Sequence, residues 1–148
     1  MKSERSASER ERLRARIRDV GLRCTAARLA VLGVLSRAAR PMSHADCAAK
    51  LASAGLDRTT VYRNLVELSD AELVARVDLG DHVWRFEIRG EVAKRADKHA
   101  HFICVDCGEI TCLPDMGVQL NRQKKDSPRA VISDVTEVLL KGHCHNCA

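Results

Sequence analysis

The chain has 148 residues, enough for one full domain or two small ones. Hydrophobic residues make up 45% of it, which can supply a core, although aromatic residues make up only 3%. No apolar run approaches the length of a membrane span, which argues against a membrane partner. Residues 1–20 are charged throughout and contain no targeting segment, so we expect a cytoplasmic protein with reduced thiols.

The positive charge lies entirely in the first half. Residues 1–76 contain 15 Lys and Arg against 9 Asp and Glu, a net charge of +6. Residues 77–148 contain 10 against 11, a net charge of −1. An Arg-rich solvated surface would explain this asymmetry, and so would a first half that binds a polyanion such as nucleic acid.

The first two predicted helices are separated by a turn. A charged helix from Ser8 to Val20 ends at Gly21, and Thr25 can cap a second helix that continues until Pro41. Cys24 and Cys47 take core-facing or near-core positions, where we expect inert thiols. Apolar residues recur at helical spacing on both helices, namely Leu13, Ile17 and Val20 on the first and Leu29, Leu32 and Leu35 on the second.

Two more helices precede a change to strand periodicity. Ser43 can cap a third helix that ends at Gly55, and Asp57 or Thr59 can begin a fourth. Residues 73–77 and 83–87, joined by a turn at 80–81, are predicted to form a β-hairpin. Helices that close on a β-hairpin make a winged helix-turn-helix, and residues 58–70 would be its recognition helix.

The rest of the chain is predicted to form a linker and a small second domain. Residues 89–98 are polar and lack a strong apolar pattern. Strands are predicted at 101–104, 110–113 and 131–140, and a helix at 115–125. The expected fold class is α+β, with an N-terminal winged helix-turn-helix over residues 1–88, a linker over 89–98 and a small α/β domain over 99–148.

Two Cys-x-x-Cys pairs bracket this second domain, Cys104 with Cys107 and Cys144 with Cys147. Two thiolates at this spacing can bind one metal ion, and two such knuckles complete the all-sulfur tetrahedral shell of structural zinc. A redox dithiol or a set of disulfides would use the same residues, but a redox motif normally needs only one pair. We expect a structural Zn²⁺ ion, which would also help so small a domain to fold.

Five motifs in one order resemble the ferric uptake regulator (Fur) family, over roughly residues 10–147. They are Gly21 to Arg28, Thr60-Val61-Tyr62-Arg63-Asn64-Leu65, Arg85-Phe86-Glu87, His99-x-His101-Phe102-Ile103-Cys104-x-x-Cys107-Gly108 and Gly142-x-Cys144-x-x-Cys147. Members of that family are dimeric, metal-sensing transcription factors, mostly repressors. The resemblance implies a homodimer that binds palindromic double-stranded operator DNA, takes no small organic substrate and carries its four-cysteine zinc in a dimerisation domain.

The predicted recognition helix offers groups that suit DNA. Arg58 can bridge two acceptors on guanine or bind phosphate, and Thr60 can donate hydrogen bonds or contact thymine methyls. An ordinary surface helix would carry the same residue types. The resemblance implies that Tyr62 and Arg63 contact operator DNA in the major groove and that Arg23 reaches the minor groove or its phosphates.

A metal sensor also needs a second, exchangeable site. His99 and His101 lie on one face of a strand, so both imidazoles can reach one ion, although a His pair in a polar linker is often solvent-exposed. The resemblance matches Glu87 to an inter-domain regulatory ligand. Cys112 stands where relatives carry a carboxylate ligand, and it is either a substituted ligand or a buried thiol. His82 is either a fifth ligand or a surface residue of the turn.

The chain also departs from the family pattern. Many members have a His two residues before the Ser that opens the third helix, and this chain has Pro41 there, with His44 one residue after that Ser. A second exchangeable site of many members is expected to be absent, because its places hold Lys98, Ala100, Gln119 and Thr136.

A thiolate among imidazoles and a carboxylate favours zinc over iron or manganese. We therefore expect a zinc-uptake repressor first, with Zn²⁺ at the regulatory site, and an Fe²⁺ or Mn²⁺ site or an iron sensor second. A peroxide sensor comes third, because such relatives favour Asp at the place of Glu87.

Two functions of other classes use the same metal-binding residues. A zinc enzyme needs an open coordination position and a pocket, and no nucleophile or oxyanion motif accompanies these ligands, so we expect no enzyme. A zinc-ribbon interaction protein would leave the basic first half unexplained.

Overall fold

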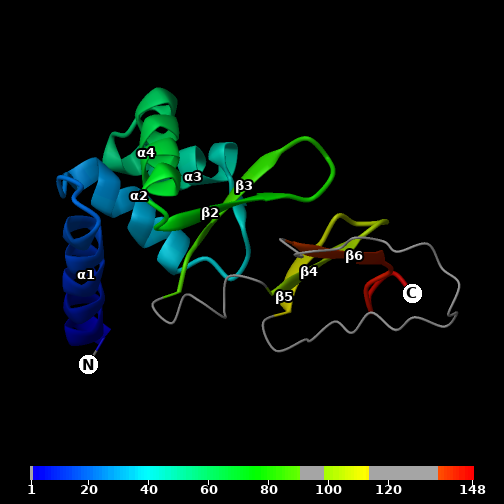
Figure 1. Ribbon diagram of the computed structural model, residues 1–148. Coiled ribbons are helices and arrows are strands. Elements are labelled where there is room, and N and C mark those ends of the chain that lie inside the picture. Colours follow the sequence, from blue (N-terminus) through cyan, green and yellow to red (C-terminus); the bar gives the residue numbers. More distant parts are fainter. Residues whose placement is uncertain (1, 91–98, 114–136) are drawn as a thin grey trace, which may run out of the picture. The chain divides into compact units, whose positions relative to one another are not determined.

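The computed structural model describes residues 2–90, 99–113 and 137–148, and the chain divides into two compact units, Met1–Glu91 and Val92–Ala148 (Figure 1). The predicted helix at 115–125, residues 91–98 of the predicted linker and most of the predicted strand at 131–140 lie outside the described residues. None of the helices within those described ranges is long and apolar enough to cross a membrane.

The first unit is built on four α-helices, whose ends follow local sequence signals. They are α1 (Lys2–Asp19), α2 (Ala26–Ser36), α3 (His44–Leu51) and α4 (Arg58–Asp70), with a 3₁₀ turn η1 (Ala52–Ala54) after α3. The Leu13 and Ile17 side chains of α1 are buried as predicted. The Val20 side chain, predicted to face inward, is 39% exposed because α1 ends at Asp19 and the chain turns at Gly21, where φ is +77°.

Side-chain caps define three of these helix starts. Thr25 Oγ1 accepts a hydrogen bond from the Arg28 N–H at 3.2 Å, as predicted. Ser43 and Asp46 form a reciprocal capping box at the start of α3. Asp57, rather than Thr59, caps α4. Two helices end earlier than the sequence suggested, α2 at Ser36 and α3 at Leu51.

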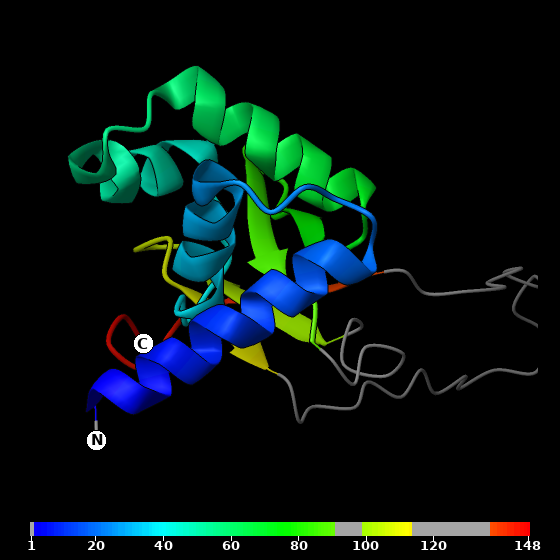
Figure 2. The same ribbon diagram turned by 90° about the vertical axis from the view of Figure 1, so that its left-hand side faces the viewer.

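A three-stranded antiparallel sheet completes this unit. The hairpin strands β2 (Val74–Asp78) and β3 (Trp84–Ile88) pair in register, and the two-residue β1 (Met42–Ser43) adds to β3, giving the order β1-β3-β2. The α4 helix packs against α2, α3 and β2 (Figure 2). Their shared core includes Val61, Leu65 and Leu68, each fully buried as predicted.

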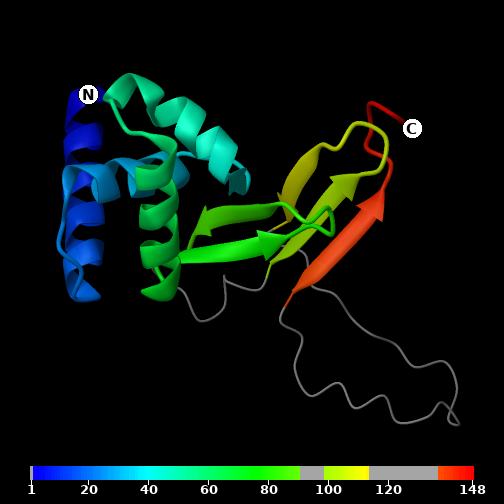
Figure 3. The same cartoon turned by 90° about the horizontal axis from the view of Figure 1, so that it is seen from above.

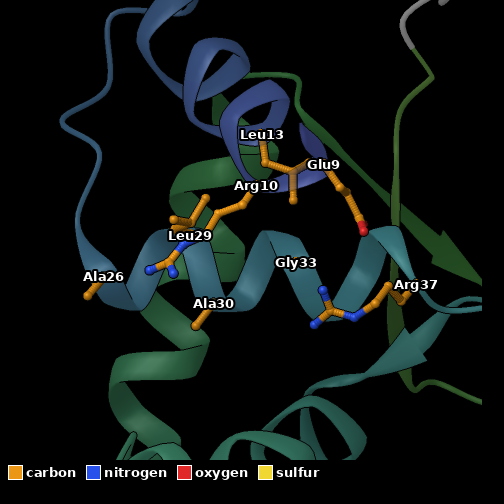
Figure 4. A pocket seen from close by; sticks show the side chains of 8 residues that line it. All are labelled: Glu9, Arg10, Leu13, Ala26, Leu29, Ala30, Gly33 and Arg37. Atoms are coloured by element: carbon orange, nitrogen blue, oxygen red, sulfur yellow. The ribbon is translucent and has the colours of Figure 1, made fainter. Parts of the chain in front are cut away.

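A cavity of about 240 Å³ lies between α1 and α2 (Figure 4). Small residues of α2, Ala30 and Gly33 among them, leave this space open. At one end, the Ser36 hydroxyl donates a hydrogen bond of 2.7 Å to a Glu9 carboxylate oxygen. No residue predicted to bind metal or DNA lines this cavity.

The second unit contains a sheet whose centre is β4 (Ala100–Cys104) (Figure 3). β5 (Ile110–Leu113) pairs antiparallel to it, and β6 (Val138–Gly142) pairs parallel to it. The β4–β6 register sets Cys104 opposite Gly142, and the Val105 N–H donates to the Gly142 carbonyl at 2.9 Å. This pairing holds the two cysteine knuckles side by side, although their residues are far apart in the chain.

Candidate metal centres and nucleic-acid interface

The four knuckle cysteines form one cluster at the end of the second sheet. The sulfurs of Cys104, Cys107, Cys144 and Cys147 all lie within 4.8 Å of one another. The Cys107 and Cys144 sulfurs are 3.8 Å apart. Ligands about 2.3 Å from a tetrahedral zinc ion are separated by about 3.8 Å, so the cluster fits such an ion.

The backbone around the cluster favours thiolates. The N–H groups of Cys107 and Cys144 point at the Cys104 sulfur, the latter at 3.3 Å, and they lower the pKa of that thiol to about 6. Hydrogen bonds with the neighbouring Cys144 and Cys107 sulfurs raise the pKa of Cys147 to about 12, because they stabilise its protonated thiol. A divalent cation would stabilise all four thiolates together, so its binding would release the protons that this sulfur cluster shares.

A contact between a histidine and an aspartate joins the two knuckles outside the cluster. The His143 Nδ1 atom lies 2.5 Å from an Asp106 carboxylate oxygen. Asp106 belongs to the first knuckle, and His143 immediately precedes the second. Sequence reasoning did not find this pair, because nothing in the pattern links two residues 37 positions apart.

Three of the predicted regulatory ligands meet within the second unit. His101 and Cys112 are directly opposite in the β4–β5 ladder, so their side chains share a face. The His99 ring lies 4.5 Å from the His101 ring, measured between centroids. The candidate ligand atoms of these three residues lie within 4.8 Å of one another, and the His101 side chain is 3% exposed. Two imidazoles and one thiol are thus gathered where one ion could contact all three.

The two other predicted regulatory residues belong to the first unit. Glu87 is half-buried on β3, next to Phe86 and on the opposite face of the strand. His82 is exposed in the hairpin turn, with a φ of +60°, and it lines a hollow together with Phe86 and Trp84. His82 and Glu87 therefore lie on different faces of the hairpin.

The family's further exchangeable site falls mostly outside the described ranges. Lys98, Gln119 and Thr136 are not among the described residues. Ala100 is 2% exposed within β4 and offers no ligand atom. At the third helix, His44 opens α3, and its Nε2 atom lies 2.8 Å from the Arg58 carbonyl oxygen.

The predicted recognition helix is α4, and it presents its polar face outward. Arg58 and Arg63 are exposed, and the Tyr62 side chain is 52% exposed. Thr60 is half-buried, and its hydroxyl donates a 2.8 Å hydrogen bond to Asp57. The Thr60 hydroxyl proton is therefore used in the hydrogen bond to the helix cap Asp57. Toward DNA, the hydroxyl oxygen can then only accept a hydrogen bond.

Arg23 lies exposed in the turn between α1 and α2. The Arg28 guanidinium donates both to the Arg23 carbonyl and to the Glu67 carboxylate of α4. Arg28 thus connects the Arg23 turn to the recognition helix. The sequence predicted no role for Arg28 beyond its place in the Gly21 to Arg28 motif, because its partner Glu67 is distant in the chain.

Residues 19–136 match the profile of the Ferric uptake regulator family. The chain belongs to this family. The ferric uptake regulation protein of Legionella pneumophila is 30% identical over 135 residues, which cover 88% of this chain and 95% of that protein. The Klebsiella pneumoniae protein of the same name is 28% identical over 134 residues, covering 86% and 81%.

The fold agrees with that of a ferric uptake regulator. The Pseudomonas aeruginosa ferric uptake regulator with manganese matches with a TM-score of 0.62 and 26% identity, covering 88% of this chain and 96% of that one. The predicted family and mixed helix and sheet fold are therefore confirmed. The chain is a metal-responsive transcription regulator, and the ferric uptake regulator family consists of regulators rather than enzymes.

Proposed function

We propose that this regulator is a zinc-responsive repressor that binds palindromic operator DNA as a metal-loaded homodimer. The observation that carries the choice of zinc is the Cys112 thiol, which lies with the His99 and His101 imidazoles in one group. Thiolate ligands favour zinc over the harder Fe²⁺ and Mn²⁺ ions.

Glu87 is the proposed fourth ligand, and it would come from the first unit. Its support is its place at the end of the hairpin, after the Arg85-Phe86 strand motif, and its half-buried carboxylate. His82 is left out of the proposed set because it lies on the face of the hairpin with Phe86 and Trp84. A bound ion would supply bonds to both units at once and so favour the one arrangement of units that binds DNA.

The two units take different roles in this proposal. The first unit, with a domain boundary near residue 88, would contact DNA through Arg58, Thr60, Tyr62 and Arg63 of α4, and through Arg23. The second unit, from residue 99, would pair with a second copy and hold the structural zinc. Support for this division comes from the charge, which is +6 over residues 1–76 and −1 over residues 77–148 by the count of 15 against 9 and 10 against 11.

A metal titration tests the proposal. Fully metal-loaded protein is used to select duplexes from a random library. The second ion is then removed, so that one tightly bound zinc remains per chain, and affinity for the selected duplex is followed against free Zn²⁺, Fe²⁺ or Mn²⁺. We expect the selected duplexes to be palindromic and their binding to require a second zinc ion per chain. In His101→Ala, added zinc should no longer increase the affinity for DNA. Equal DNA affinity with and without the second ion would overturn the proposal.

An iron sensor is the second candidate, because the relatives named above are ferric uptake regulation proteins. The Cys112→Ser variant separates the two, since it exchanges a soft donor for a hard one. We expect it to weaken the zinc response at least tenfold while changing the iron response much less. Equal weakening for both metals would remove the argument for zinc.

A further inference from the structure

A hollow of about 390 Å³ lies beside the recognition helix, within the first unit. It is lined from three elements, by His44 at the start of α3, by Tyr62 and Val66 of α4, and by Val83 and Trp84 of the hairpin. None of the proposed metal ligands lines it. The hollow adjoins Tyr62, which is one of the proposed DNA contacts.

Strand geometry explains why Trp84 stands at this edge. Side chains two residues apart on β3 share a face, so Trp84 and Phe86 point the same way. Phe86 is 2% exposed in the core, but Trp84 lies beyond the edge of that core and is 57% exposed. The hairpin thus carries a large apolar ring that the described residues leave more than half exposed.

Exposed apolar side chains concentrate at the hollow. Within the described ranges, five large hydrophobic side chains are exposed, and three of them, Tyr62, Val83 and Trp84, line it. The other two, Val20 and Val105, lie elsewhere in the sequence. Clustering of this kind marks a binding surface, whereas scattered exposed residues need no explanation.

Two of the polar residues that line the hollow, His44 and Arg76, already contact other groups of the protein. The His44 ring meets the Tyr62 ring edge-on at 5.4 Å, and its Nε2 atom lies 2.8 Å from the Arg58 carbonyl. The Arg76 guanidinium lies 3.5 Å from the Asp70 carboxylate. With these two groups occupied, the exposed side chains of Tyr62, Val83 and Trp84 make the hollow suited to an apolar group.

The hairpin turn beside the hollow disfavours phosphate. Asp78 accepts a hydrogen bond from the Gly80 N–H, and Asp81 pairs with Arg85 at 2.7 Å. This end of the hairpin therefore carries two carboxylates, Asp78 and Asp81, and one guanidinium, Arg85, which is already paired with Asp81. A phosphate oxygen would meet negative charge here, so the ligand that fits is uncharged as well as apolar.

The major groove of DNA offers one apolar group, the C5-methyl of thymine. We propose that the hollow receives a thymine methyl group of the operator, and that Trp84 is a specificity-determining residue. This inference rests on the proposed DNA-binding function, because α4 must lie in the major groove for the hollow to reach base edges. Trp84 of the hairpin would then contact a base in addition to the proposed base contacts of the recognition helix.

Thymine-to-uracil substitution tests the inference, because it removes only the methyl group. A duplex selected by the metal-loaded wild-type protein is scanned by replacing each thymine with deoxyuridine. We expect one position per half-site at which wild-type binding weakens about fourfold, as for the loss of one buried methyl group. In Trp84→Ala the same substitution should have no effect. The Val20→Ala variant, which truncates an exposed apolar side chain outside the hollow, should keep the fourfold difference.

Trp84 is the only tryptophan of the chain, so its fluorescence reports on the hollow directly. We expect the emission of Trp84 to shift on binding the thymine duplex and to shift less with the uracil duplex. If the Ala variant fails to fold, Trp84→Gln provides the same test, because its polar side chain also removes the apolar contact. An unchanged uracil effect in these variants, or emission that DNA leaves unaltered, overturns the inference and points to a protein partner instead. Failure of the wild-type protein to bind any duplex would overturn the proposed function itself.

Discussion

At the scale of single residues, the surroundings of each thiol decide its reactivity. Cys47 is fully buried in α3, and burial raises the pKa of its thiol to about 11. Cys24, for which the sequence predicted the same inert role, is only half-buried. Cys47 and Cys24 therefore allow the reactivity of a fully buried thiol to be compared with that of a half-buried one.

We predict that Cys47 resists alkylation in the folded protein. At pH 8 a thiol with a pKa near 11 is ionised in roughly one molecule in a thousand, and only the thiolate reacts. Zinc-loaded protein treated with iodoacetamide and mapped by mass spectrometry should carry label on Cys24 and none on Cys47. Denaturation in guanidinium should make both react. Equal labelling of the two thiols in the native state would contradict the packing of α3.

At the scale of elements, α3 depends on its cap. The Ser43 hydroxyl accepts from the Asp46 N–H at 3.1 Å, and the Asp46 carboxylate accepts from the Ser43 N–H at 3.1 Å. Ser43→Ala removes the first bond, and we expect a loss of about 1 kcal/mol in the free energy of unfolding. Ser53→Ala, at an exposed position of η1, is the matched control and should change little. Urea denaturation of both variants at constant metal checks this, and similar midpoints would contradict the cap's contribution.

Sequence patterns predicted most elements of the first unit, because caps and apolar periodicity are local signals. Thr25, Ser43 and Asp57 each begin a helix as their residue types suggest. The β1 strand was missed, since two residues have no periodicity and its pairing with β3 depends on tertiary contact. The early start of α1 was also missed, because residues 2–7 carry no apolar stripe.

At the candidate sites, residue types were easier to predict than contacts. Cysteine spacing identified the four-sulfur cluster, whose geometry depends on the β4–β6 register. The pairing of Asp106 with His143 and the contacts of Arg28 were not predictable, because both join segments distant in sequence. Cys112 was chosen by resemblance, and the ladder that sets it opposite His101 supplies the physical reason.

At the scale of the whole molecule, the two units differ in what holds them together. The first unit has a continuous core that runs from Leu13 to Phe86. In the described part of the second unit, buried hydrophobic residues are few, Ala100, Cys104 and Ile110, and one of them is itself a candidate zinc ligand. The second unit should therefore depend on its metal far more than the first.

This difference predicts that Cys104→Ser unfolds the second unit and leaves the first folded. Serine cannot replace a thiolate on zinc, and Cys104 is 1% exposed, so the change also buries a hydroxyl. Light scattering should show a monomer, thermal unfolding should lose one transition, and Trp84 emission should still report a folded hairpin. Cys24→Ser makes the same chemical change at a half-buried position of the first unit and should keep both the dimer and its zinc. A stable dimer of Cys104→Ser with one zinc still bound per chain would show that the sulfur cluster does not hold the second unit together.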